Sequence, residues 1–283
     1  MSKTRDRIRQ SRLQYKRELG QNFIYDENLL RALVEASGVT GEDDVLEIGP
    51  GAGSLTKPLC AAAHHVLSLE LDERLIPLLR VFMEGADNFT LVQGDVMTAN
   101  LPELTKDLRK PFCVVANIPY YITTPLLNLL LGGGLPIRLM ALMVQKEVAD
   151  KLLAAPGDEG WGPLSVRAQY RTEPRLAMEV PAACFTPPPK VDSAFVVLPV
   201  RERPPVAVRS EKDFFAVVNA AFALRRKTLA NSLAASLRLE RADAAALVAQ
   251  AGLPEQVRGE KLSLENFARL SDAWSEMKEN REA

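Results

Sequence analysis

The sequence predicts an α/β protein in which a parallel sheet is covered by helices on both faces, followed by a small all-helical domain. Three observations lead to this prediction. Short runs of β-branched and apolar residues alternate with helix-like segments up to residue 200. A glycine-rich turn directly follows the first of these runs. No convincing strand occurs after residue 212.

Six segments are predicted to be strands, because each is short, largely apolar and close to turn-forming residues. They cover residues 44–48, 65–71, 89–93, 112–117, 138–144 and 194–200. Helices are expected between them, near residues 26–37, 54–63, 72–83, 123–131 and 146–154. Ligands of such sheets bind beyond the carboxyl ends of the strands, so functional residues are expected where the strands end.

The chain is predicted to have three parts. Residues 1–20 form a basic arm that is expected to be flexible, and residues 21–200 form the α/β domain. A Pro-rich, charged stretch at 201–210 is typical of a linker, so residues 201–283 are assigned to the helical domain. Helices are expected there at 213–237, 241–251 and 263–277.

Composition and charge exclude several classes of protein. Three distant cysteines and two adjacent histidines argue against a disulfide framework or a zinc site, so no metal is expected. No segment is apolar enough to span a membrane and no secretory leader is apparent, so a cytoplasmic location is expected.

The net charge is −1, yet residues 1–17 carry seven Lys or Arg against one acid. This uneven distribution of charge has two possible interpretations. The basic segments either bind a polyanionic partner or form an ordinary solvent-exposed surface.

The turn after the first strand reads Glu-Ile-Gly-Pro-Gly-Ala-Gly at residues 47–53. Because glycine lacks a Cβ, the backbone at Gly49 and Gly51 can approach a ligand closely. Glu70 ends the second strand, where a carboxylate would accept hydrogen bonds from ribose hydroxyls, and Asp95 could accept one from an adenine amine. The GxGxG spacing fits a nucleoside without a pyrophosphate, such as S-adenosylmethionine. A purely structural turn is the alternative.

The fourth strand ends in Asn117-Ile118-Pro119-Tyr120, a set that fits chemistry on a planar nitrogen. An exocyclic adenine amine is a poor nucleophile, so an enzyme must position it and accept hydrogen bonds from it. The Asn117 side-chain oxygen and the Ile118 carbonyl could be these acceptors. Pro119 restricts the backbone of Ile118, and Tyr120 offers a ring on which a base could stack. The alternative is a proline turn with a core tyrosine.

A stiff loop at residues 184–193 precedes the last strand and contains three consecutive prolines. Phe185 could contact the opposite face of a base that stacks on Tyr120, and Lys190 could meet a phosphate. Alternatively, Phe185 fills the core.

Taken together, these motifs resemble the KsgA/RsmA family of ribosomal RNA adenine N6-dimethyltransferases. The resemblance covers nearly the whole chain in order. It rests on GQNFI (20–24), EIGPGAGSLT (47–56), Glu70, Gly94-Asp95, NIPYYITTP (117–125), QKEVADKL (145–152), CFTPPPKVDS (184–193) and FALRRKTLANSL (222–233). It implies a class I, Rossmann-like S-adenosylmethionine-dependent methyltransferase sheet with a C-terminal helical domain that binds rRNA.

The resemblance also implies roles for individual residues. Contacts to S-adenosylmethionine are expected from Asn22, Ile24, Gly49, Gly51, Glu70, Asp95 and Asn117. Asn117 and Ile118 would hold the target amine, Pro119 would shape that turn, and Tyr120 and Phe185 would enclose the adenine. The implied substrate is a pair of adjacent adenosines in the 3′-terminal hairpin loop of 16S rRNA. This RNA is expected to be presented on an immature small ribosomal subunit to a monomeric enzyme.

Two alternatives stay open on the sequence alone. NIPY also occurs in Erm-type enzymes, which methylate a 23S rRNA adenosine. The chain could also act chiefly as a small-subunit assembly factor, with methylation secondary. A small-molecule methyltransferase is disfavoured, because it gives no reason for basic segments or base-stacking residues.

Overall fold

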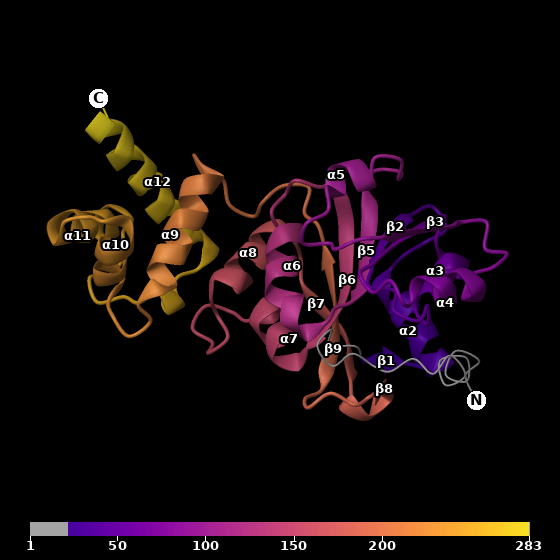
Figure 1. Ribbon diagram of the computed structural model, residues 1–283. Helices are drawn as coiled ribbons and strands as arrows, with labels where there is room; N and C mark the ends of the chain where they lie inside the picture. The colour runs from indigo at the N-terminus through magenta and orange to yellow at the C-terminus, as the bar shows by residue number, and fades with distance from the viewer. Residues whose placement is uncertain (1–21, 283) are drawn as a thin grey trace. The chain divides into compact units, whose positions relative to one another are not determined.

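The computed structural model describes residues 22–282, so the predicted arm at 1–20 lies outside the described residues. The chain divides into two compact units (Figure 1). The first comprises the chain up to Ala149 together with Glu173–Val200. The second comprises Asp150–Thr172 together with the chain from Arg201 onward. Each unit is therefore assembled from two separate stretches of sequence.

Within residues 22–282, the first unit is built on a seven-stranded sheet with the order β4-β3-β2-β5-β6-β9-β7. The strands are β2 (Asp44–Ile48), β3 (His65–Glu70), β4 (Phe89–Gln93), β5 (Phe112–Asn117), β6 (Ile137–Gln145), β7 (Arg175–Val180) and β9 (Ser193–Pro199). The strands from β4 to β6 are parallel, whereas β9 is antiparallel to both of its neighbours. The sheet is therefore mostly parallel, as predicted, and only β9 runs in the opposite direction, because the chain returns from β7 to β9 without a crossover helix.

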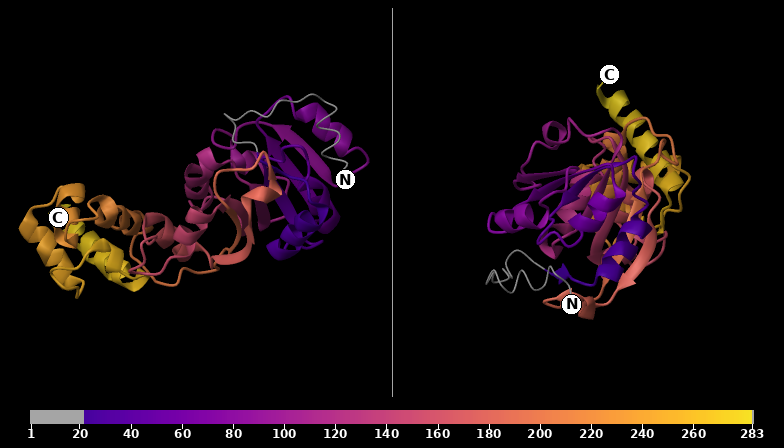
Figure 2. Two further views of the ribbon diagram at one scale, coloured as in Figure 1. Left: turned by 90° about the horizontal axis from the view of Figure 1, so that it is seen from below. Right: turned by 90° about the vertical axis from the view of Figure 1, so that its right-hand side faces the viewer.

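Helices lie on both sides of this sheet (Figures 1 and 2). They are α2 (Glu27–Ser37), α3 (Thr56–Ala62), α4 (Ile76–Phe82), α5 (Leu101–Leu104) and α6 (Thr123–Leu130). Helix α7 (Lys146–Leu153) begins in this unit and ends in the second. Helix α2 begins where the Asp26 side chain accepts hydrogen bonds from the backbone of Asn28 and Leu29. It ends at Gly38, whose φ of 77° is the left-handed conformation common at this position.

Both faces of the sheet are buried. Val45, Val66 and Val115 belong to one core cluster together with Leu33 of α2 and Leu59 of α3. Successive side chains of a strand point to opposite faces. Their neighbours along the strands are also almost fully buried, namely Leu46, Leu67 and Val114. A sheet buried on both faces explains why these strands are continuous apolar runs.

A second sheet of two short strands lies at the carboxyl-end edge of the first. In it, β1 (Phe23–Ile24) pairs antiparallel with β8 (Phe185–Thr186), so that Ile24 lies opposite Phe185. This pairing fixes the start of the described chain against a segment about 160 residues later. It was not expected from the sequence, and it matters for the site below.

The second unit is all-helical among its described residues. Its helices are α8 (Pro163–Arg171), α9 (Glu211–Ala223), α10 (Leu229–Leu237), α11 (Arg241–Gln250) and α12 (Leu264–Glu282). Tyr170 of α8 stacks on Phe214 of α9 with ring centroids 4.8 Å apart. The Trp161 indole N–H donates to the carbonyl of Leu262 at 3.0 Å. Helix α8, which the sequence analysis did not predict, thus completes the core of this unit.

The predicted helix at 213–237 is wrong, because the chain turns between α9 and α10. The Ser232 hydroxyl donates to the carbonyl of Ala220 at 2.7 Å and accepts from the backbone N–H of Leu224 at 3.1 Å. A buried serine thereby supplies the hydrogen bonds that the interrupted helix lacks at its end. The Arg225-Arg226-Lys227 run lies in this turn and is exposed.

Candidate active site

The loop between β2 and α3 turns sharply at three glycines. Gly49, Gly51 and Gly53 have φ values of 70°, 60° and 82°, which residues with a Cβ rarely adopt. At Gly51 a Cβ would also lie 2.6 Å from Cε1 of Phe23 in β1. No atom would lie within 4 Å of a Cβ at Gly49. The loop is therefore packed tightly against β1 at Gly51 and open toward a ligand at Gly49.

Glu70, at the end of β3, holds this loop in place. Its Oε2 accepts a hydrogen bond from the backbone N–H of Gly51 at 2.9 Å, and its Oε1 accepts from that of Asp72 at 2.8 Å. Burial raises the pKa of Glu70, while these two backbone donors oppose the rise. Each carboxylate oxygen can accept more than one hydrogen bond, so Glu70 keeps acceptor capacity for a ligand.

Asp95 lies two residues beyond β4. Its Oδ1 accepts from the backbone N–H of Met97 at 2.9 Å, which fixes the carboxylate. The backbone N–H of Gly94 donates to the carbonyl of Glu70 at 2.9 Å. Adjacent parallel strands thus bring Glu70 and Asp95 to the same edge of the sheet, as predicted from their positions at strand ends.

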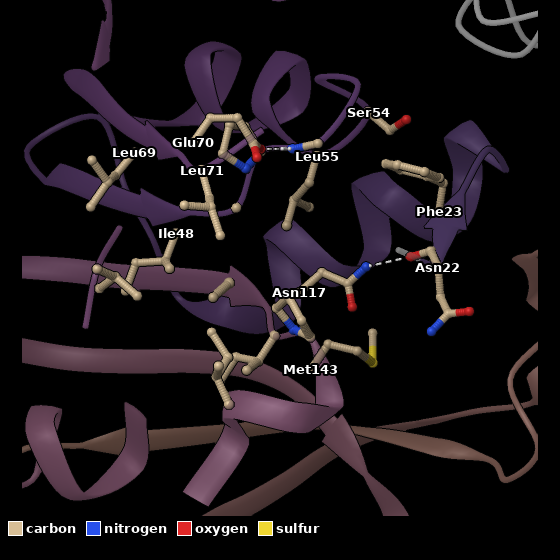
Figure 3. A pocket seen from close by; sticks show the side chains of 18 of the residues that line it. Asn22, Phe23, Ile48, Ser54, Leu55, Leu69, Glu70, Leu71, Asn117 and Met143 are labelled. Atoms are coloured by element: carbon tan, nitrogen blue, oxygen red, sulfur yellow. Dashed lines mark hydrogen bonds between the residues drawn. The ribbon is translucent and has the colours of Figure 1, made fainter. Parts of the chain in front are cut away.

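Asn117, at the end of β5, has a side-chain amide of defined orientation. Its Nδ2 donates to the backbone carbonyl of Asn22 at 3.0 Å (Figure 3). A carbonyl oxygen can only accept, so the nitrogen of the amide must face it. The amide oxygen Oδ1 is therefore turned away from Asn22. Because β1 pairs with β8, the carbonyl that orients Asn117 is itself held in place.

Ile118 and Tyr120, which follow Asn117, are each held by a hydrogen bond to another strand. The Ile118 backbone N–H donates to the carbonyl of Met143 in β6 at 3.2 Å, and its side chain is 1% exposed. Tyr120 begins the 3₁₀ turn at Tyr120–Ile122, and its hydroxyl lies 2.6 Å from Oγ of Ser193. Burial raises the pKa of Tyr120, so the ring is neutral and anchored by its hydroxyl.

These elements border one cavity (Figure 3). Nearly all of the predicted site residues line it: Asn22, Ile24, Gly49, Gly51, Glu70, Asp95, Asn117, Ile118, Pro119 and Tyr120. Phe185 is the exception, because it is not among the residues that line the cavity. It is 3% exposed and belongs to the same core cluster as Ile24. The position of Phe185 therefore matches the core alternative rather than a ring that stacks on a base.

Glu47 lies beneath the glycine loop and is 1% exposed. Its Oε2 accepts a hydrogen bond of 2.5 Å from the Ser68 hydroxyl of β3. The other oxygen, Oε1, is buried without a hydrogen bond of ordinary geometry, although the Thr56 hydroxyl is near enough to lower the pKa slightly. Burial dominates and raises the pKa of Glu47 to about 7. Glu47 therefore supports the loop from inside the core.

Several residues at this cavity were not predicted from the sequence. Phe23 packs against Gly51, and Leu71, Met97 and Tyr121 line the cavity while remaining 44%, 37% and 53% exposed. Leu71 directly follows Glu70, and Tyr121 directly follows the Asn117–Tyr120 set. Adjacency to residues already identified is therefore the signal that could have revealed them.

Metal-binding clusters and membrane-spanning helices are both absent from the described part of the chain. No group of three or more His, Cys, Asp or Glu side chains in residues 22–282 is arranged to hold a metal ion. No helix within the same residues is long and apolar enough to cross a membrane.

A family model and curated proteins from two bacteria match nearly the whole chain. The family model for ribosomal RNA adenine dimethylase matches residues 12–275. Ribosomal RNA small subunit methyltransferase A of Latilactobacillus sakei is 43% identical over 280 residues, which is 97% of this chain and 94% of that protein. The protein of the same name from Shouchella clausii is 44% identical over 265 residues, which is 91% of this chain and 89% of that protein.

Two solved structures share the fold over most of the chain. A dimethyladenosine transferase from Plasmodium falciparum has a TM-score of 0.72 at 25% identity, covering 88% of this chain and 95% of that one. The 23S rRNA methyltransferase ErmE has a TM-score of 0.69 at 29% identity, and the match covers 90% of this chain and 100% of that one.

Proposed function

The chain belongs to the ribosomal RNA adenine dimethylase family, and from that premise we propose that it dimethylates two adjacent adenosines of 16S rRNA at N6, using S-adenosylmethionine. The observation that carries this proposal is the oriented amide of Asn117, whose nitrogen faces the carbonyl of Asn22. Its oxygen is therefore available as the acceptor that an adenine amine requires.

The cavity suits S-adenosylmethionine. Two carboxylates, Glu70 and Asp95, border it at neighbouring strand ends, where hydroxyl and amine donors of a nucleoside need acceptors. The backbone at Gly49 is open to close approach. We assign the binding of S-adenosylmethionine to Asn22, Ile24, Gly49, Gly51, Glu70, Asp95 and Asn117. When bound, the sulfonium supplies a strongly electrophilic methyl group, so the mechanism proposed here uses no metal.

The protein's own part in the transfer is to position the amine. In the first transfer, Oδ1 of Asn117 and the Ile118 carbonyl accept the two N–H groups of the adenine amine, which directs its lone pair along the line of transfer. The methylated nitrogen then releases one proton, so in the second transfer a single N–H remains for these acceptors. The Tyr120 ring, anchored to Ser193, supplies the stacking surface for the base. The buried position of Phe185 leaves it a supporting role, in which it holds β1 and hence the Asn22 carbonyl.

Several finer points belong to the same proposal. The substrate is 16S rRNA on an immature small subunit in the cytoplasm, and the enzyme acts as a monomer. Residues 201–283, with the exposed Arg225-Arg226-Lys227 turn, bind rRNA together with the arm at 1–20. Replacing one phosphate-binding Lys or Arg in these segments should make the plot of log K against log salt shallower, by about 0.9 or less.

A direct test is methyl transfer from labelled S-adenosylmethionine to unmethylated small subunits and, separately, to 23S rRNA. The label is then located by nucleoside mass spectrometry. We expect N6,N6-dimethyladenosine at two neighbouring 16S positions. Label on 23S rRNA alone would instead favour the Erm-type alternative, for which the similarity to ErmE is the relevant observation. Tight binding to subunits without transfer would favour the assembly factor.

A further inference from the structure

Tyr121 follows the proposed catalytic set but is used by no step of the proposed mechanism. It lies in the 3₁₀ turn Tyr120–Ile122 and lines the same cavity. Its side chain differs from that of Tyr120 in one respect. The Tyr120 hydroxyl is anchored to Ser193, whereas the Tyr121 side chain is 53% exposed and has no hydrogen bond within residues 22–282.

Tyr121 lines the same cavity as Glu70 and Asp95. Partial burial is the main cause of its raised pKa, and the negative charges of Asp95 and then Glu70 raise it further. These are the two carboxylates assigned above to the ribose and adenine. The raised pKa keeps the hydroxyl protonated, so Tyr121 presents a neutral aromatic ring to the cavity.

Part of the rim of the cavity is apolar. Leu71 and Met97 line it and are 44% and 37% exposed, so two apolar side chains and the Tyr121 ring border its mouth together. Exposed apolar surface at the mouth of a pocket is shielded from water when a ligand binds. A planar, partly apolar nucleoside is a ligand of suitable chemistry for this rim.

We propose that Tyr121 covers the nucleoside of bound S-adenosylmethionine on its solvent side and thereby sets the affinity for the cofactor and its demethylated product. This inference rests on the proposed function, because it takes Glu70 and Asp95 as nucleoside ligands. It assigns Tyr121 to the cofactor and not to the target base, which stacks on Tyr120.

The test is calorimetric binding of S-adenosylhomocysteine to the full chain without RNA. Tyr121→Ala should weaken binding by about 5- to 150-fold, the range expected for loss of one base–aromatic stack. Tyr121→Phe keeps the ring and should remain within about threefold of the unsubstituted protein. Leu176→Ala is the matched control, because Leu176 is 45% exposed in β7 of the same unit but does not line the cavity.

Kinetics distinguish cofactor contact from RNA contact. We expect KM for S-adenosylmethionine to rise in Tyr121→Ala while KM for the small subunit is unchanged. Unaltered affinity for S-adenosylhomocysteine would overturn the inference, and a raised KM for the subunit in that case would place Tyr121 against RNA instead. If the unsubstituted protein bound no S-adenosylhomocysteine, the proposed function itself would fail. Far-UV circular dichroism of each variant checks that the fold is retained.

Discussion

Replacement of Glu47 by Gln should stabilise the protein, and increasingly so as the pH rises. The carboxylate is buried beneath the glycine loop and its pKa is about 7, against an ordinary value of 4.5. That difference corresponds to about 3 kcal/mol of unfolding free energy. Because the pKa is higher in the folded state, this contribution is fully present below pH 4.5 and is lost as the pH rises to about 7. A glutamine never ionises, so it avoids the loss.

The assay is urea unfolding of both proteins at pH 5.5 and pH 8. The advantage of Glu47→Gln should grow by about 2 kcal/mol between these two values. Both tryptophans, Trp161 and Trp274, lie in the second unit, so tryptophan fluorescence follows that unit alone. Far-UV circular dichroism follows both units, and the part of its transition that fluorescence does not share reports on the first. Glu42→Gln, at an exposed position of the first unit, is the control.

A constant stability difference between Glu47→Gln and the unsubstituted protein at both pH values would refute this reasoning. It would mean that Glu47 ionises equally readily in the folded and unfolded chains. A change confined to the tryptophan signal would refute it as well, because Glu47 lies in the first unit.

Three further predictions concern the site. Asn117→Ala should lower the single-turnover transfer rate by about 10²- to 10³-fold, which is the usual cost of a lost transition-state hydrogen bond. The circular dichroism spectrum should be unchanged. Retention of a tenth of the normal rate would contradict the role assigned to Asn117. Gly51→Ala should weaken binding of S-adenosylhomocysteine by at least about tenfold, because its Cβ would lie 2.6 Å from Phe23 at a φ of 60°. Gly85→Ala, with a φ of 83° and no atom near its Cβ, should leave that affinity unchanged when measured by calorimetry. Tyr120→Phe keeps the ring but loses the hydrogen bond to Ser193, so kcat/KM for the small subunit should fall by less than about tenfold. The fall should be clearly smaller than in Tyr120→Ala. Equal losses in the two variants would show that the hydroxyl, not the ring, is needed.

The buried strands could be predicted from the sequence almost to the residue. The predicted strand at 44–48 matches β2, and that at 112–117 matches β5. Such strands are continuous apolar runs because both faces of the sheet are covered, so the pattern is strong. Strand β7 was missed because most of its residues are exposed or half-buried, so it lacks that signal. The direction of β9 was also missed, because pairing depends on the connection and not on the strand's own residues.

The site could be predicted where it depends on strand ends. Glu70, Asp95 and Asn117 meet at one edge because β3, β4 and β5 run in the same direction in one sheet, with β2 between β3 and β5. The buried position of Phe185 could not be predicted in the same way. The two-residue pairing of β1 with β8 decides which way that side chain points, and two residues carry no periodicity that a sequence could reveal.

The place of β9 in the sheet has a consequence during synthesis of the chain. Strand β6 is nine residues of largely apolar sequence, and its partner on one side, β9, ends 54 residues later. At about 5–20 residues per second, translation takes about 3–11 s to supply that partner. During this interval the nascent chain carries an unpaired apolar edge, which is a site for aggregation. The enzyme is therefore expected to need chaperone protection before its last strand emerges.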